Sequence, residues 1–232
     1  MTLRSTLLTA RVAGMLVLVL IVIPMLPLLM TGDWGWWEAW AYVVVSIVGF
    51  VLSRWLAARR HPDLLAERAR FMDHEDAKPW DRLLAPLVAL GSVAILLVAG
   101  LDARAGWSPD FGMVARVTGL ALFVAGYVLG SWAMVANRFF SGMVRIQVDR
   151  GHQVVAQGPY GWIRHPGYAG AIVSYLAMPA IFGSLWAWAP AVLLVILLVI
   201  RTRLEDATLR AELEGYQAYA DRVRYRLLPG VW

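Results

Sequence analysis

Uncharged stretches divide this chain into a series of apolar runs. Four of them have 15 to 21 residues each: Ala13–Met30, Ala39–Ser53, Leu83–Leu101 and Val117–Asn137. A helix of about 20 residues crosses a bilayer, so these runs predict transmembrane helices. The first run follows Arg4 and Arg11 as a signal peptide would, but it has no small-residue cleavage site and continues into Pro24 and Pro27. We therefore interpret it as a span.

The last apolar run, Pro166–Ile200, has 35 uncharged residues. One continuous helix of that length would measure about 52 Å. The hydrocarbon layer of a bilayer is only about 30 Å thick. The run therefore predicts a tight hairpin of two helices that turns near Gly183 and Ser184, with a single span and a cytoplasmic helix as the alternative.

Basic residues fall on alternate sides of the predicted spans. The N-terminal tail, segments 54–82 and 138–164, and the tail from Arg201 hold 19 of the 21 Lys and Arg residues. By the positive-inside rule these four segments are cytoplasmic, and so are both termini. The net charge of +5 is then explained by membrane topology, and we expect no nucleic-acid partner.

Composition agrees with a membrane protein. The chain is 60% hydrophobic and 16% charged, whereas soluble domains average about 45–50% and about 25%. The predicted fold is an all-α polytopic membrane bundle of five to six transmembrane helices, in the inner membrane of a bacterium. We divide the chain into residues 1–136, which shape the lipid side, and 137–232, which form a cytoplasmic cofactor-binding region.

The sequence excludes several kinds of site. It contains no cysteine, so disulfides and thiolate chemistry are excluded. Its four histidines are widely separated, and we predict no metal site. The pattern Gly126-x-x-x-Gly130 is typical of helix pairing, but packing within the chain or chance explains it as well as a dimer does. Oligomeric state is not assigned.

Two cytoplasmic segments have ambiguous patterns. Segment 54–82 is interpreted as a solvated charged loop, with an amphipathic surface helix over Leu64–Phe71 as the alternative. In the second segment, Val144, Ile146 and Val148 alternate with polar residues, and Asp149–His152 has the composition of a turn. This alternation predicts a small β-hairpin in which Gln153–Ala156 is the returning strand.

A Gly- and Pro-rich loop with three aromatic residues, Gly158–Tyr168, follows this segment. Glycines allow a ligand to approach the backbone closely, although an interfacial loop would have a similar composition. After the last apolar run, Arg201 and Glu205 are four residues apart and share a helix face. Glu205 and Asp206 lie about one turn beyond this run. Burying an acidic side chain close to the membrane costs free energy unless the side chain is paired or functional.

Together these two blocks resemble the isoprenylcysteine carboxyl methyltransferase family. The matching residues are Gly158-Pro159-Tyr160, then Arg164-His165-Pro166-x-Tyr168, and finally Arg201-x-x-x-Glu205-Asp206-x-x-Leu209. Two departures are visible: Asp206 replaces the second glutamate of the pattern, and Leu213–Tyr216 replaces a Phe-Gly-x-x-Tyr tail. The resemblance covers residues 137–232.

The resemblance implies an integral-membrane methyltransferase, of enzyme class EC 2.1.1, that uses S-adenosylmethionine and a lipophilic acceptor, either a small molecule or a lipidated chain. It implies Arg201 and Glu205 as catalytic residues, with Arg201 orienting the acceptor carboxylate and Glu205 holding either Arg201 or the cofactor ammonium group. The expected cofactor-binding residues are Gly158, Pro159, Tyr160, Arg164, His165, Pro166, Tyr168, Gly170, Glu205 and Asp206.

Other functions remain open at this point. A lipid N-methyltransferase would use the same cofactor site, but its amine acceptor must lose a proton and would lose rate at low pH. A steroid-reductase-like membrane oxidoreductase would bind NADPH instead. A membrane protein without enzymatic activity is the third alternative. The sequence does not identify the methyl acceptor.

Overall fold

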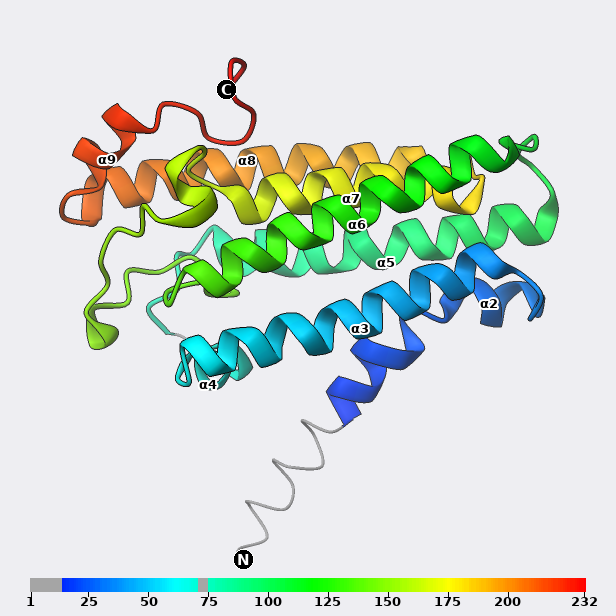
Figure 1. Ribbon diagram of the computed structural model, residues 1–232, viewed down its shortest axis with the longest axis horizontal. Coiled ribbons are helices and arrows are strands. Elements are labelled where there is room, and N and C mark those ends of the chain that lie inside the picture. Colours follow the sequence, from blue (N-terminus) through cyan, green and yellow to red (C-terminus); the bar gives the residue numbers. More distant parts are fainter. Residues whose placement is uncertain (1–13, 71–74) are drawn as a thin grey trace, which may run out of the picture.

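The computed structural model describes residues 14–70 and 75–232, and within these ranges it is helical and contains no strand (Figure 1). The α-helices are α2 (Leu26–Thr31), α3 (Trp37–Arg60), α4 (Leu64–Ala69), α5 (Asp81–Ala105), α6 (Gly112–Ala136), α7 (Pro166–Phe182), α8 (Trp188–Glu212) and α9 (Tyr216–Arg222). The predicted all-α bundle is confirmed.

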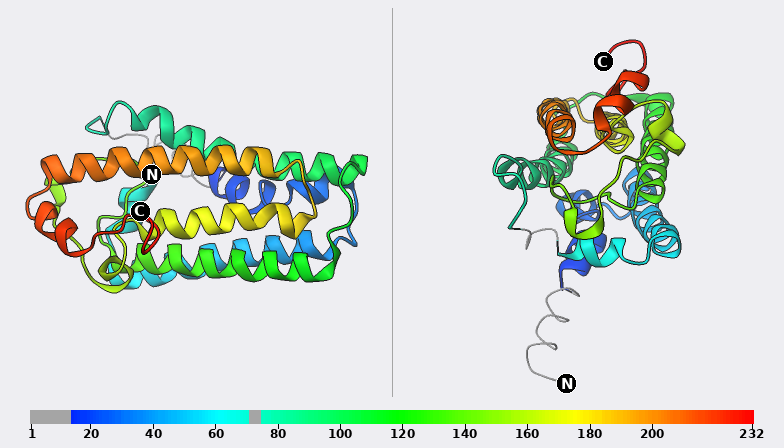
Figure 2. Two further views of the ribbon diagram at one scale, coloured as in Figure 1. Left: turned by 90° about the horizontal axis from the view of Figure 1, so that it is seen from above. Right: turned by 90° about the vertical axis from the view of Figure 1, so that its left-hand side faces the viewer.

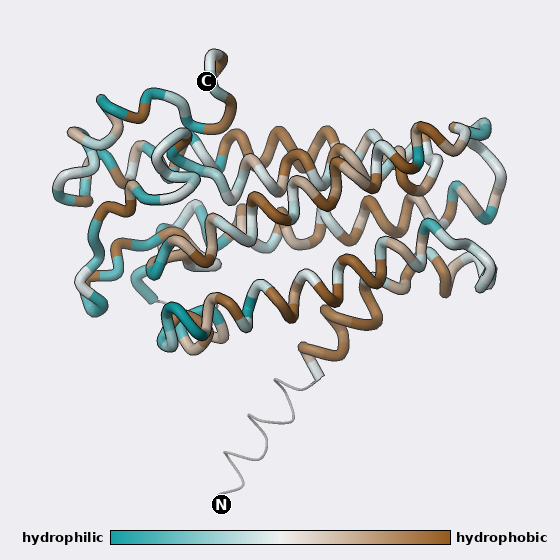
Figure 3. Tube along the Cα trace, viewed as in Figure 1, coloured by the Kyte–Doolittle hydropathy of each residue, from teal (hydrophilic) through white to brown (hydrophobic). Residues whose placement is uncertain are grey.

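Three helices of the described chain, α3, α5 and α6, are long and apolar enough to cross a bilayer. Figure 3 shows their apolar middle parts side by side, with hydrophilic residues gathered at the ends of the bundle. The predicted hairpin is also confirmed, because α7 ends at Gly183, which has a φ of +64°, and α8 returns beside α7 (Figure 2). The number of crossings and the side of each terminus stay predictions.

The first apolar run is interrupted. Its described part begins at Gly14 and passes through a π-helical turn, Leu18–Val22, before bending at Pro24 and restarting as α2. Proline has no backbone N–H to continue a helical hydrogen-bond ladder. The arginines that precede this run lie outside the described residues.

Glycines bring α6 and α7 into close contact. A Cβ atom added to Gly126 would lie 2.5 Å from the carbonyl oxygen of Gly170, and one added to Gly170 would lie 2.4 Å from that of Gly126. Because only glycine fits at such a crossing, the pattern that begins at Gly126 serves packing within the chain. The crossing fixes the start of α7, which carries part of the site described below.

Segment 54–82 contains a helix where a solvated loop was predicted. The solvated loop is wrong, because α4 forms there and fully buries Leu64. Phe71, the predicted end of this helix, lies outside the described residues. The buried guanidinium of Arg145, in the segment between α6 and α7, forms ion pairs with Glu67 of α4 at 2.9 Å and with Asp76 at 2.8 Å.

The predicted β-hairpin at residues 144–156 is wrong, although its turn is confirmed. A 3₁₀ turn, Val148–Arg150, ends at Gly151 with a φ of +63°. The flanking segments do not pair as strands in the described chain because side chains take their backbone groups. The N–H of Val144, for example, donates to the carboxylate of Asp81 at 2.6 Å.

The glycine crossing yields a test of the fold. Gly126→Ala should lower the free energy of unfolding by about 1–3 kcal/mol, as overpacking typically does. Gly130→Ala is the matched control, since its added Cβ would meet only the Gly167 carbonyl oxygen at 3.8 Å. Thermal unfolding in detergent measures both variants. Equal melting temperatures for the two would contradict the proposed crossing.

Candidate functional site

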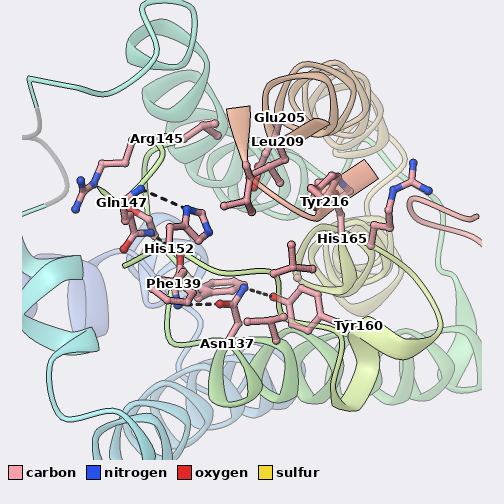
Figure 4. A pocket seen from close by; sticks show the side chains of 18 of the residues that line it. Asn137, Phe139, Arg145, Gln147, His152, Tyr160, His165, Glu205, Leu209 and Tyr216 are labelled. Carbon is pink, nitrogen blue, oxygen red and sulfur yellow. Dashed lines mark hydrogen bonds between the residues drawn. The ribbon is translucent and has the colours of Figure 1, made fainter. Parts of the chain in front are cut away.

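A pocket lies at the end of the bundle where α6 ends and α7 begins, and three parts of the chain meet there (Figure 4). One wall is the segment from Asn137 to Arg164, the second is the start of α7, and the third comes from α8 and α9. Six of the predicted site residues line it: Tyr160, Arg164, His165, Tyr168, Arg201 and Glu205. The two motif blocks, which are about 40 residues apart in sequence, therefore converge on one space.

The other predicted residues lie outside the pocket wall. Gly158 packs against α6, where a Cβ atom would approach the Trp132 indole nitrogen to 3.2 Å. Pro159 and Pro166 stand in the first turns of the 3₁₀ helix Gly158–Gly161 and of α7, where proline's missing N–H has no cost. Gly170 lies in the α6–α7 crossing.

Asp206 lies behind the wall and is only 1% exposed. Its carboxylate binds three arginines, one tyrosine and one histidine: Arg164, Arg210, Arg226, Tyr216 and His165. The pair with Arg164 is bidentate, with distances of 2.7 Å and 2.9 Å. Such a fork-to-carboxylate pair fixes both distance and orientation.

The environment of Asp206 keeps it ionised. Burial acts to raise the pKa of its carboxyl, but hydrogen bonds from His165 and Arg164, together with their charges, hold that pKa well below its ordinary value. Burial and the neighbouring Asp206 raise the pKa of Tyr216. Tyr216 therefore stays protonated and donates its O–H to Asp206 at 3.0 Å.

Arg164 also holds the C-terminal segment. Its Nη1 donates to the carbonyl oxygens of Val223 and Arg224, both at 2.7 Å. The backbone N–H groups of Arg164 and His165 donate to the carbonyls of Tyr225 and Arg226, both at 2.9 Å. The tail after α9 thus closes over the loop that carries the first motif.

Arg201 pairs with Asp81, and Glu205 does not hold it. The Nε and Nη2 atoms of Arg201 donate to the two carboxylate oxygens of Asp81 at 2.7 Å and 2.8 Å, and Nη2 also donates to the Gly142 carbonyl. Asp81 is fully buried and Arg201 is 8% exposed. The bidentate face that we expected to bind an acceptor carboxylate is therefore already occupied.

Glu205 is half-buried in the pocket wall. Tyr168 donates its hydroxyl to the Oε2 atom of Glu205 at 2.5 Å. The ring of Tyr168 also stacks beside that of His165, with centroids 5.9 Å apart. This arrangement leaves the second oxygen of Glu205 without a hydrogen-bond partner among the described residues, so it can accept from a ligand in the pocket.

The segment before the first motif contributes residues that the sequence analysis missed. Asn137 donates to the hydroxyl of Tyr160 at 3.2 Å, and Gln147 donates its side-chain amide to the Phe139 carbonyl at 2.7 Å (Figure 4). The alternation in this segment suggested a strand, and that interpretation concealed these inward-facing polar side chains.

His152 also lines this wall. Burial, followed by the charges of Arg145 and Arg150, lowers the pKa of its imidazole to about 4. The ring is therefore neutral at pH 7. Its Nδ1 accepts a hydrogen bond from the Gln147 backbone N–H at 3.3 Å, which places the proton on Nε2.

Residues 119–211 match the model of the isoprenylcysteine carboxyl methyltransferase (ICMT) family. The family resemblance is confirmed. The matched region contains α7, the first motif and most of α8, and hence six pocket residues that the sequence predicted.

Individual relatives match shorter parts of the chain. A lamin-B receptor of Drosophila melanogaster is 32% identical over 97 residues, which is 40% of this chain and 13% of that protein. Probable protein-S-isoprenylcysteine O-methyltransferases of Oryza sativa subspecies indica and japonica are 36% identical over 56 residues, which is 24% of this chain. The match covers 29% of each rice protein.

The buried pair behind the ICMT-like pocket should be a main source of its stability. Asp206→Asn should cost about 3–5 kcal/mol, because it leaves buried guanidinium charge without a counter-charge. The depressed pKa adds a pH dependence: stability from Asp206 is fully present above its unfolded-state pKa of about 3.9 and is lost as pH falls through the folded-state value.

Thermal unfolding of both proteins between about pH 8 and about pH 5 should therefore show a constant difference. Asp221→Asn is the matched control, since Asp221 is exposed and only accepts a hydrogen bond from Gln217. If Asp206→Asn melted like this control, the assigned importance of Asp206 would be wrong.

Proposed function

We propose that this protein is an integral-membrane methyltransferase that moves a methyl group from S-adenosylmethionine to a carboxylate on a lipophilic acceptor. The observation that carries the proposal is the convergence of both motif blocks on one pocket within the ICMT-like region. The pocket lies at the end of a bundle whose helices α3, α5 and α6 suit a bilayer. A site at that position is accessible to a soluble cofactor and to a membrane lipid.

The donor set of the pocket fits S-adenosylmethionine. Glu205 offers a carboxylate oxygen for the ammonium group, and Tyr216 and Tyr219 offer aromatic surface for the adenine ring. His152 offers an N–H from Nε2. Gly158, Pro159, Pro166 and Gly170 would contribute by packing the loop against α6, and Asp206 by holding the wall that Arg164 and His165 form.

When bound, S-adenosylmethionine supplies a methyl group on a positively charged sulfur, which is already activated for displacement. The chain must then align the acceptor with that group and exclude water. A carboxylate acceptor is ionised at pH 7, so no general base is needed. The pocket agrees with a reaction that needs no base, because two of its titratable side chains are already hydrogen-bonded: His165 to Asp206 and Tyr168 to Glu205.

Arg201 would contact the acceptor carboxylate through Nη1. Asp81 fixes the guanidinium plane, and Nη1 has no hydrogen bond to the described residues. A single N–H at this point would orient a carboxylate more loosely than a bidentate fork would. We propose that residues 1–136 complete the acceptor side, in an inner membrane with both termini in the cytoplasm.

Cofactor binding tests this proposal without knowledge of the acceptor. Purified protein should bind S-adenosylhomocysteine in a calorimetric titration. Glu205→Ala should weaken that binding by about tenfold or more, because a charged hydrogen bond is lost. Glu214→Ala is the matched control, since Glu214 is exposed on the connection between α8 and α9 and lies outside the pocket wall.

A parallel titration with NADPH addresses the reductase alternative. Saturable binding of NADPH without binding of S-adenosylhomocysteine would overturn the proposal. So would equal affinity of the Glu205→Ala and wild-type proteins for S-adenosylhomocysteine, since Glu205 would then not contact the cofactor.

A further inference from the structure

The residues after α9 form a closed loop, the C-terminal loop (residues 223–232). Three successive backbone N–H groups, those of residues 226–228, donate to the Trp232 carbonyl at 2.9, 3.0 and 3.2 Å. Gly230, with a φ of +82°, makes the turn at the tip. Figures 1 and 2 show the loop beside α7 and α8, where it points away from the axis of the bundle. The loop is therefore held in shape by its own hydrogen bonds and projects sideways.

The level of this loop along the bundle is set by the start of α7. The backbone N–H groups of Arg164 and His165 donate to two carbonyl oxygens of the loop, both at 2.9 Å. Pro166 follows directly and begins both α7 and the uncharged run that ends at Ile200. On α8, Ile200 is exposed, and Arg203, which is also exposed, follows on the same helix face. The loop thus lies where the apolar surface of the bundle gives way to charged residues, as at a membrane–water interface.

The tip of the loop exposes aliphatic side chains. Leu228 is 57% exposed and Val231 is 73% exposed. Scattered aliphatic residues of this kind are common on the surface of soluble proteins and need no explanation there. Here, however, a projecting loop exposes two of them at the level of the interface, beside the apolar run that forms α7 and the first part of α8. In a bilayer, lipid would cover them.

Arginines without a carboxylate partner lie at the same level. Arg203, Arg222 and Arg224 are exposed, and none has a carboxylate oxygen within 4.0 Å in the part of the chain that the structure describes. By contrast, Arg226 of the same loop is neutralised by Asp206 at 2.9 Å. Unpaired basic residues next to a membrane are attracted to anionic lipid headgroups.

We propose that the C-terminal loop docks on the anionic phospholipid surface beside α7 and α8. Leu228 and Val231 enter the boundary between headgroups and acyl chains, and Arg222 and Arg224 bind lipid phosphates. An apolar tip next to basic residues is the combination by which interfacial segments bind membranes. The inference concerns the lipid that surrounds the protein, so it does not depend on the proposed methyltransferase function.

Docking would also restrain one wall of the ICMT-like pocket. The guanidinium of Arg164 donates to the carbonyl oxygens of Val223 and Arg224, both at 2.7 Å, and Arg226 binds Asp206 behind the wall. The loop and this wall are therefore one hydrogen-bonded unit. A lipid surface that holds the loop in place holds the wall as well.

Spin-label depth measurements on the full-length protein in nanodiscs test this inference. Because the chain contains no cysteine, Val231→Cys introduces a single labelling site, and Leu228→Cys gives an independent second one. In discs of phosphatidylcholine and phosphatidylglycerol, either label should collide often with oxygen, which concentrates among acyl chains, and rarely with a water-soluble nickel chelate. Ala218→Cys is the matched control, since Ala218 is exposed on α9 and its label should collide mainly with the chelate.

The contribution of charge is measured in the same discs with the label at position 231. Arg222→Gln and Arg224→Gln should each lower the ratio of inserted to free label by about fivefold, as expected for one basic residue at an anionic surface. Discs without phosphatidylglycerol and high salt should lower it too. Arg104→Gln is the control for lost charge, because Arg104 is exposed in the last turn of α5, at the opposite end of the bundle, and should leave the ratio unchanged. Thermal unfolding in detergent shows that each variant is folded.

Three results would overturn the inference. Equal accessibility to the nickel chelate at positions 231 and 218 would place the loop in water. Protection of position 231 from both reagents would indicate that a protein surface covers the loop instead of lipid. Equal insertion in discs with and without phosphatidylglycerol would exclude an anionic lipid as the partner.

Discussion

The bidentate pair between Arg164 and Asp206 is the interaction on which the candidate site depends. It joins the loop of the first motif to α8, which carries the second, at 2.7 Å and 2.9 Å. The same guanidinium holds the backbone of the C-terminal segment. Without this pair the pocket would lose a wall, because the loop and the tail contain few helical hydrogen bonds of their own. A buried carboxylate shared by three arginines thus adds to the small hydrophobic cluster that Leu213, Tyr216, Tyr219 and Ala220 form in this region.

Much of the fold could be predicted from local sequence. Uncharged runs located α3, α5 and α6, and Gly183 marked the turn between α7 and α8. These features are local, since helix length and a positive φ depend on a few neighbouring residues. Arg201 and Glu205 were placed on one helix face by their spacing alone. The first apolar run was less predictable, because its prolines could either kink a span or end it.

The partners of the charged residues could not be predicted. Asp81 and Arg201 are 120 positions apart, and nothing in either neighbourhood indicates their ion pair. The β-hairpin prediction failed for the same reason: the N–H of Val144 bonds to a distant carboxylate and not to a neighbouring strand. Arg222 and Arg224 looked like two more charges on the cytoplasmic side, and only the three-dimensional arrangement places them beside the start of α7. Long-range electrostatics, which determine the site, leave no periodic pattern in a sequence.

Carboxyl methylation itself can be tested most directly with tritium-labelled S-adenosylmethionine. The purified protein would be incubated with a total lipid extract, and label in the lipid phase would be treated with mild alkali. Methyl esters hydrolyse under these conditions, so we predict that the label is released as volatile methanol and that Glu205→Ala transfers much less of it. Label that stays in the lipid phase after alkali would indicate N-methylation, and absence of transfer from a folded protein would contradict a methyltransferase function.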